Sequence, residues 1–131
     1  DIRRDFPGGW KGDPQNAFNP ATQTAEQKDF HDFTQKVLTW RKGKDVIHTG
    51  KTKHYMPKDK VYVYFRYNES EKVMVVINNN EKEQILDLNR FAESLNGVSA
   101  GKDIISGKDF VVTSKNKLTV SGKSSLILEL K

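Results

Sequence analysis

The sequence VYVYFRY at residues 61–67, followed by KVMVVIN at residues 72–78, decides the fold. Both runs are rich in β-branched and aromatic residues, which favour a pleated, half-buried strand. Alternation places Tyr62, Tyr64 and Arg66 on one face of the first run, opposite its valines and Phe65. In the second run both faces are apolar, which predicts a central position in a sheet. The polar residues 68–71 between the runs predict a hairpin turn.

Further short stretches of strand character lie before and after this hairpin, separated by turn signals. They are residues 51–56, 84–88, 102–105, 110–112, 118–120 and 125–130, and residues 89–95 predict a short helical turn. Many short strands at regular spacing are typical of an antiparallel sandwich or barrel. We therefore predict a mainly β fold whose C-terminal part is a Greek-key-like antiparallel β-sandwich.

The N-terminal third follows a different pattern. Prolines and glycines interrupt residues 1–21, which predicts an irregular loop of a length that is uncommon in a self-contained small domain. Thr24 and Gln27 form a capping box ahead of a helix predicted over residues 25–42. Apolar side chains recur along this helix at helical spacing, which is more typical of a packing face than of a ligand site: Phe30, Phe33, Val37 and Trp40. We therefore divide the chain into a loop and amphipathic helix, residues 1–47, and an all-β domain, residues 48–131.

Composition excludes several classes of protein. The 131 residues contain no cysteine, so disulfides and thiol catalysis are excluded and a structural zinc site is not expected. The net charge is +5, but the lysines sit singly at turns instead of clustering with aromatics, so we expect a solvated lysine-rich surface and no nucleic-acid partner. No apolar run approaches the roughly 20 residues that a membrane-spanning helix needs, so no membrane partner is expected.

The sequence shows no catalytic or metal-binding motif. His31, His48 and His54 lack metal-ligand spacing, and neither a phosphate-binding glycine loop nor a nucleophile elbow is present. We therefore expect no metal ion, no cofactor and no catalytic residue in this chain.

Several motifs resemble one family. The sequence DFPGGW at residues 5–10, then GD at 12–13 and NAF at 16–18, resembles the segment after the last barrel strand of neopullulanases and cyclomaltodextrinases. These enzymes belong to the α-amylase family, glycoside hydrolase family 13. The helix with WRK at residues 40–42 resembles the final barrel helix, and VIHTG at 46–50 resembles the linker into the C-terminal domain. The resemblance extends over essentially the whole chain and is greatest to periplasmic starch-utilisation enzymes of Bacteroides-type bacteria.

The resemblance implies that the chain is the C-terminal part of a longer enzyme. Residues 1–5 contain no initiator methionine and no signal pattern, so we expect Asp1 to be a cut end. The family hydrolyses α-glucosidic bonds with retention, using carboxylates that follow earlier barrel strands. The implied partner of this chain is thus the missing catalytic barrel, through which it would serve α-glucan hydrolysis without being catalytic itself. The resemblance further implies a periplasmic or extracellular parent.

Three aromatic residues are candidates for sugar contacts, because sugars stack their apolar faces on aromatic rings. Trp10 either lines an outer subsite of the parent or wedges its loop, and Tyr62 and Tyr64 either form a sugar platform or cover a neighbouring element. Two broader hypotheses remain: a module that stabilises the barrel, and a stand-alone carbohydrate-binding β-sandwich. Because aromatic residues in residues 1–42 would lose their partners without the barrel, we also expect self-association through that segment.

Overall fold

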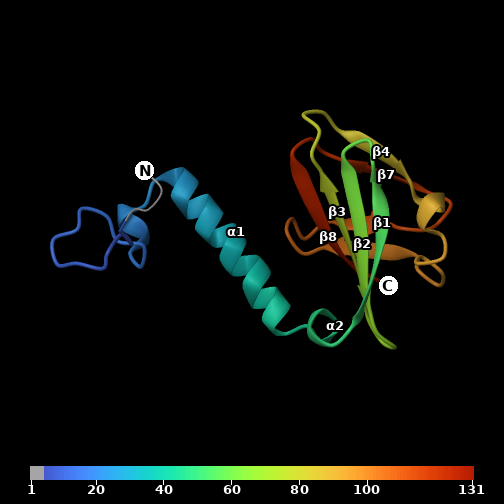
Figure 1. Cartoon of the computed structure of the whole chain (residues 1–131), viewed down its shortest axis with the longest axis horizontal. Helices are drawn as coiled ribbons and strands as arrows, with labels where there is room; N and C mark the ends of the chain where they lie inside the picture. Colours follow the sequence, from blue (N-terminus) through green and yellow to red (C-terminus); the bar gives the residue numbers. More distant parts are fainter. Residues whose placement is uncertain (1–4) are drawn as a thin grey trace. The chain divides into compact units, whose positions relative to one another are not determined.

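The computed structural model describes residues 5–131 (Figure 1). The chain divides into two compact units, one ending at Thr39 and the other comprising Trp40–Lys131. Residues 1–4, where the sequence predicts a cut end, lie outside the described residues. The boundary predicted after residue 47 concerns the parent enzyme and stays a prediction. Residues 40–47 nevertheless belong to the same compact unit as the β-strands.

The N-terminal unit consists of a loop, a short 3₁₀ helix η1 (Pro20–Thr22) and most of helix α1 (Ala25–Lys42). The predicted capping box is confirmed. The Gln27 amide donates to Thr24 Oγ1 over 3.2 Å, and the Thr24 amide donates to Gln27 Oε1 over 3.0 Å. These two bonds satisfy backbone donors that the first helical turn leaves unpaired, so α1 begins where the sequence predicts.

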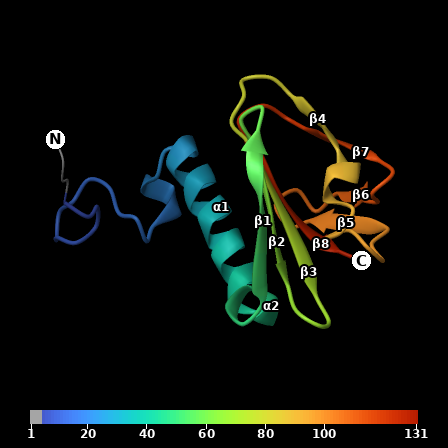
Figure 2. The same ribbon diagram turned by 45° about the vertical axis from the view of Figure 1, so that its right-hand side comes forward.

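The β unit contains eight strands in two antiparallel sheets, within the part of the chain that the structure describes. The strands are β1 (Lys51–Lys58), β2 (Val61–Tyr67), β3 (Lys72–Asn78), β4 (Gln84–Asp87), β5 (Ala100–Asp103), β6 (Asp109–Val111), β7 (Lys117–Val120) and β8 (Ser124–Leu130). The larger sheet has the order β1-β2-β3-β8-β5-β6, and the smaller one pairs β4 with β7. The prediction of a mainly β chain with an antiparallel sandwich is confirmed, and β3 is central, as its two apolar faces indicate (Figure 2).

Two short helices accompany the strands. Helix α2 (Asp45–His48) precedes β1, and the 3₁₀ helix η2 (Leu88–Phe91) overlaps the helical turn predicted over residues 89–95 but begins one residue earlier. The η2 helix is capped by Asp87, whose carboxylate accepts a hydrogen bond from the Asn89 amide over 2.9 Å. Its Leu88 and Phe91 side chains are buried, so η2 contributes to the core as well as connecting the sheets.

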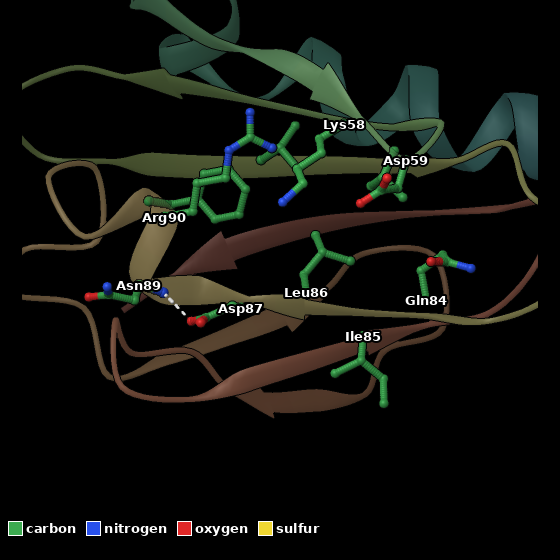
Figure 3. Close-up of a pocket in the computed structure, with 11 residues that line it drawn as sticks. Lys58, Asp59, Gln84, Ile85, Leu86, Asp87, Asn89 and Arg90 are labelled. Carbon is green, nitrogen blue, oxygen red and sulfur yellow. Dashed lines mark hydrogen bonds between the residues drawn. The ribbon is translucent and has the colours of Figure 1, made fainter.

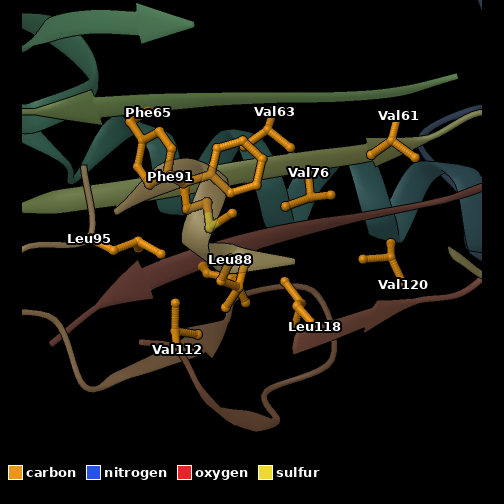
Figure 4. Close-up of a cluster of buried hydrophobic side chains, with 12 residues drawn as sticks. Val61, Val63, Phe65, Val76, Leu88, Phe91, Leu95, Val112, Leu118 and Val120 are labelled. Atoms are coloured by element: carbon orange, nitrogen blue, oxygen red, sulfur yellow. The ribbon is translucent and has the colours of Figure 1, made fainter. Parts of the chain in front are cut away.

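The core fills the space between the two sheets (Figure 4). The larger sheet contributes the inward faces of β2, β3 and β8, and the opposite side is formed by η2, β7 and their neighbours. The buried members are Val61, Val63, Phe65, Met74, Val76, Leu88, Phe91, Leu95, Val112, Leu118, Val120 and Leu128. Complete burial of one such side chain contributes about 1.5–3 kcal/mol, so this layer is the main source of the domain's stability.

Two buried polar residues fix the connections around this core. The Asn78 amide at the end of β3 donates to the carbonyl oxygens of Val120 and Ser121, which join it to the end of β7. The Asp103 carboxylate accepts from the Ser106 amide over 2.8 Å and from the Ile127 amide over 3.0 Å. Both side chains are hydrogen-bonded in place of water, as burial of a polar group requires.

Candidate functional surface

The three predicted sugar-contact residues lie in different units. Trp10 belongs to the N-terminal unit, whereas Tyr62 and Tyr64 are on β2 of the β unit. Sugar binding stays a prediction for each location.

The Trp10 loop is built around one carboxylate. Asp13 Oδ2 accepts hydrogen bonds from the Gly8 amide over 2.9 Å and from the Trp10 amide over 3.1 Å. Gly8 has a φ of 95°, and a Cβ there would lie 2.5 Å from the side-chain oxygen of Asn16, so only glycine fits. The loop is thus ordered by its own polar contacts while the Trp10 side chain remains 73% exposed.

Tyr62 and Tyr64 form a pair of rings on the outer face of the larger sheet, the face turned away from the core. Their centroids are 5.6 Å apart and the ring planes are inclined by 33°. Across the strand pair Tyr62 lies opposite Ile77 of β3, and Tyr64 lies opposite Val75. His54 of β1 packs edge-on against Tyr62, with centroids 6.3 Å apart. This part of the outer face is therefore aromatic and aliphatic, a composition more typical of a buried face than of a solvated one.

A second hydrophobic cluster continues this surface. Val46 of α2 is buried against Val73 and Val75 on the outer side of β3. Partly buried side chains complete the cluster: Trp40, Ile47, Tyr64 and Ile127. Partial burial raises the pKa of Tyr64 above its ordinary value, because the ionised phenolate would lose hydration. Tyr64 is thus packed into a cluster along one side, which favours the structural interpretation of this residue.

A group of polar contacts, here called the anchor, holds residues 40–47 on the sheet. Trp40 Nε1 donates to Glu129 Oε1 of β8 over 2.5 Å. Lys44 Nζ lies 2.8 Å from the same Glu129 oxygen and 3.3 Å from Glu71 Oε1 in the β2–β3 turn. Arg66 Nη2 donates to the Ile47 carbonyl over 2.7 Å. Indole, ammonium and guanidinium groups therefore all fix the linker between α1 and β1 to the outer face.

The charges of the anchor support one another. The hydrogen bond to Glu129 raises the pKa of Lys44 despite partial burial. Desolvation acts to raise the pKa of Glu129, but the hydrogen bonds from Lys44 and Trp40 outweigh it and hold that pKa below its usual range. Both groups are therefore charged near neutral pH, and the anchor is strongest there.

A cleft of about 420 Å³ opens between the β1–β2 turn and β4, a feature that the sequence did not predict (Figure 3). Lys58 and Arg90 lie on one side of it, and Leu86 and Asp87 belong to the strand on the other. Arg90 Nη2 donates to the Met56 carbonyl over 2.6 Å, and its guanidinium lies over the Phe91 ring. The cleft combines cations and carboxylates on an apolar floor. Its residues come from four separate elements, β1, β2, β4 and η2, so no local sequence signal marks it.

The histidines remain dispersed in the folded chain. His31 lies beside Asp32 on α1, His48 is hydrogen-bonded to the Arg41 carbonyl over 3.0 Å, and His54 packs against Tyr62. Residues 5–131 hold no group of three His, Cys, Asp or Glu side chains arranged for a metal ion. Helix α1 is not apolar enough to cross a membrane, and neither is any other helix in the described range.

The fold and the anchored linker define a class: a two-sheet antiparallel domain that follows a helix. The chain belongs to the cyclo-malto-dextrinase C-terminal domain family, whose profile matches residues 52–129. The predicted resemblance to the C-terminal part of α-amylase-family enzymes is thereby confirmed. Its Bacteroides-type source stays a prediction.

Solved structures share the fold at low sequence identity. A variant of AmyP in complex with maltotriose matches with a TM-score of 0.73 and 12% identity, over 86% of this chain and 23% of that chain. An α-amylase from Geobacillus thermoleovorans, complexed with acarbose, matches with a TM-score of 0.67 and 16% identity, over 79% of this chain and 23% of that one. The trehalulose synthase MutB from Pseudomonas mesoacidophila matches with a TM-score of 0.63 and 19% identity, over 86% of this chain and 21% of that one. The chain thus spans less than a quarter of the length of these proteins.

Proposed function

We propose that this chain is the non-catalytic C-terminal part of a retaining α-amylase-type glycoside hydrolase that acts on α-glucans, and that it stabilises the catalytic barrel. The family match to a C-terminal domain supports this proposal, as does the small share of each similar enzyme that the chain covers. On this proposal the nucleophile, the acid and the third carboxylate belong to polypeptide outside this chain. This chain would contact the domain that contains them without contributing a catalytic residue.

The observation that carries the stabilising role is the anchor. A flexible tether between two domains is typically polar and makes few contacts. Here residues 40–47 instead bury Val46 and pack Trp40. They also join two strands, because Lys44 pairs with Glu129 of β8 and the Ile47 carbonyl accepts from Arg66 of β2. A linker that is held in this way transmits the stability of the β domain to the helix that enters it, because unfolding of that helix end must break the anchor.

Product analysis of this chain incubated with maltoheptaose tests the non-catalytic role. We expect no glucose or maltose above a buffer control over a day at neutral pH. Release of either sugar at a rate proportional to protein concentration, and retained through repurification, would refute the proposal. The same product analysis with cyclodextrin tests a cyclic substrate.

The second candidate is a carbohydrate-binding β-sandwich, which the Tyr62–Tyr64 ring pair favours. Calorimetric titration with maltoheptaose distinguishes the two functions. The stabilising role predicts no saturable heat, whereas a binding module predicts saturable heat that Tyr62→Ala removes. Because Trp10 lies in the other unit, the same titration of Trp10→Ala tests separately whether the N-terminal loop contributes to binding.

A further inference from the structure

The turn between η2 and β5 contains the one asparagine of the sequence that is followed by glycine, Asn96. The Val98 amide donates to the Leu95 carbonyl over 3.0 Å, which closes a four-residue turn with Asn96 and Gly97 at its centre. Gly97 has a φ of 77° and Asn96 does not have a positive φ, a combination that corresponds to a type II turn. Glycine is favoured at the third position of this turn because it lacks a Cβ.

The reactive groups of this turn are open to solvent. Asn96 and Gly97 are both exposed. Within residues 5–131 neither the Asn96 side-chain amide nor the Gly97 N–H has a hydrogen-bond partner. A Cβ built on Gly97 would meet no heavy atom within 4 Å. The Gly97 nitrogen is therefore unhindered and lies one residue from the side-chain carbonyl carbon of Asn96, the atom with which it can close a five-membered ring.

We propose that Asn96 is a site of spontaneous deamidation, with water as the co-reactant. The Gly97 nitrogen attacks Asn96 Cγ, and the new bond between nitrogen and carbon closes a succinimide. The bond from Cγ to Nδ2 breaks, and the amide nitrogen leaves as ammonia together with the proton that the Gly97 nitrogen gives up. Water then opens the ring at either of its two carbonyl carbons, which yields aspartate or isoaspartate. No atom is oxidised or reduced, and the proposal is independent of the proposed function.

The other asparagines of the sequence lack this combination. Each is followed by a residue other than glycine, whose side chain crowds the attacking nitrogen. Asn78 is only 1% exposed, and its Nδ2 donates to the carbonyl oxygens of Val120 and Ser121, so its amide is held in place. Asn89 is exposed like Asn96 but precedes Arg90, which makes it an internal reference in the same unit.

The structure also predicts which product disturbs the fold. Leu95, directly before the site, is 2% exposed in the core, and Val98 packs against the same core. The Ser94 carbonyl accepts a hydrogen bond from Lys72 Nζ of β3 over 2.6 Å. Isoaspartate adds one carbon atom to the backbone between these fixed points, whereas aspartate leaves the backbone length unchanged. Both products remove one unit from the net charge of +5, but only isoaspartate should strain the turn.

Peptide mapping after incubation of this chain at mildly alkaline pH tests the proposal. Trypsin releases residues 91–102, in which Asn96 is the only asparagine, and residues 83–90, in which Asn89 is the only one. Mass spectrometry measures conversion of each amide to an acid, and labelling by an isoaspartyl methyltransferase identifies isoaspartate. We expect Asn96 to convert at least about tenfold faster than Asn89, because only Asn96 precedes an unhindered nitrogen. The rate should rise with pH, since the deprotonated nitrogen is the attacking group.

Three variants separate the steps. Gly97→Ala should slow the conversion by about tenfold, because the added methyl group shields the nitrogen and disfavours a φ of 77°. Asn96→Gln retains Gly97 and an amide, but its longer side chain needs a six-membered ring, so acid formation in residues 91–102 should be lost even if the alanine variant fails to fold. Asn96→Asp supplies the aspartate product, and its unfolding rate in urea should stay within about twofold of the parent sequence.

The isoaspartate form, separated from the parent by cation-exchange chromatography, should unfold about fivefold faster or more than Asn96→Asp. Equal conversion of Asn96 and Asn89 in the parent chain would overturn the proposed site, as would undiminished acid formation in residues 91–102 of Asn96→Gln. Equal unfolding rates for the isoaspartate form and Asn96→Asp would overturn the strain assigned to the turn.

Discussion

Replacement of Asn78, the last residue of β3, by alanine should destabilise the β unit by about 3 kcal/mol. The side chain is 1% exposed. Its Nδ2 lies 3.1 Å from the Lys82 carbonyl, 3.1 Å from the Val120 carbonyl and 2.9 Å from the Ser121 carbonyl, and its Oδ1 accepts from the Asn80 amide over 2.9 Å. Alanine would leave these groups without that partner, at about 1–3 kcal/mol for each one that water cannot reach.

The magnitude follows from burial. The bond to the Val120 carbonyl is the buried one, so its loss incurs most of the penalty, while groups nearer the surface recover hydration. Urea unfolding followed by near-ultraviolet circular dichroism measures the change. With a slope of about 1–1.5 kcal/mol per molar urea, the midpoint should fall by about 2–3 M.

The neighbouring Asn79 offers a matched control, because its side chain is exposed and bonds only to Lys123 at the surface. Asn79→Ala should move the midpoint by less than about 0.5 M, as surface substitutions usually do. Equal midpoints for the two variants would refute the conclusion that Asn78 joins the two sheets.

Three other predictions concern charge and association. The Asp103 carboxylate is desolvated, but hydrogen bonds from Ser106 and Ile127 hold its pKa below the unfolded value of about 4. Its contribution to stability is therefore present above pH 4 and is lost as the pH falls through the lower pKa of the folded state. Asp103→Asn should make the free energy of unfolding less dependent on pH in this acid range, and an unchanged dependence would contradict the assignment. Glu129→Gln keeps an acceptor for Trp40 but removes the charge beside Lys44. It should lower the free energy of unfolding in urea by about 1 kcal/mol, and an unchanged value would show that the ion pair of the anchor does not stabilise the fold. Self-association through residues 1–42 should raise the mass seen by light scattering at high concentration, and a strictly monomeric chain at every concentration would exclude it.

The local structure was predictable where a short pattern determines it. The helix begins as predicted because its capping box acts within the first turn, and it ends at Lys42, directly before a glycine that favours a helix end, Gly43. The period-2 pattern likewise located the hairpin of residues 61–78, including the central place of its second strand. In both cases residues close together in the sequence make the deciding interactions, so a short stretch of sequence is enough to predict the local structure.

The long-range structure was not predictable, because its deciding interactions join residues that lie far apart in the sequence. Trp40 was expected on a helical packing face, but its indole partner Glu129 lies 89 positions further along the chain. Asn78 ends a predicted strand, but its buried partner, the Val120 carbonyl, belongs to β7 of the other sheet, 42 positions further along the chain. The cleft between β1 and β4 depends on the spacing of the two sheets, which no local pattern encodes.

The interpretation of the tyrosines changed with the structure in a specific way. The sequence left a sugar platform and a packing face as alternatives for Tyr62 and Tyr64. The structure places Tyr64 in the cluster with Val46 and Val75, while Tyr62 lies opposite the exposed Ile77. The two residues therefore differ in environment although they occupy equivalent places in the alternation, because the anchor covers only one end of the face.

Removal of residues 50–131 from the full-length protein is the most direct measurement of whether this domain stabilises an α-amylase-type barrel. The truncated protein should still cleave maltoheptaose immediately after purification, since the carboxylates lie elsewhere on this account. Its activity at a fixed elevated temperature should then decay at least about tenfold faster than that of the intact protein. Equal rates of decay would contradict the stabilising role, and loss of all hydrolysis from a folded barrel would contradict the non-catalytic one.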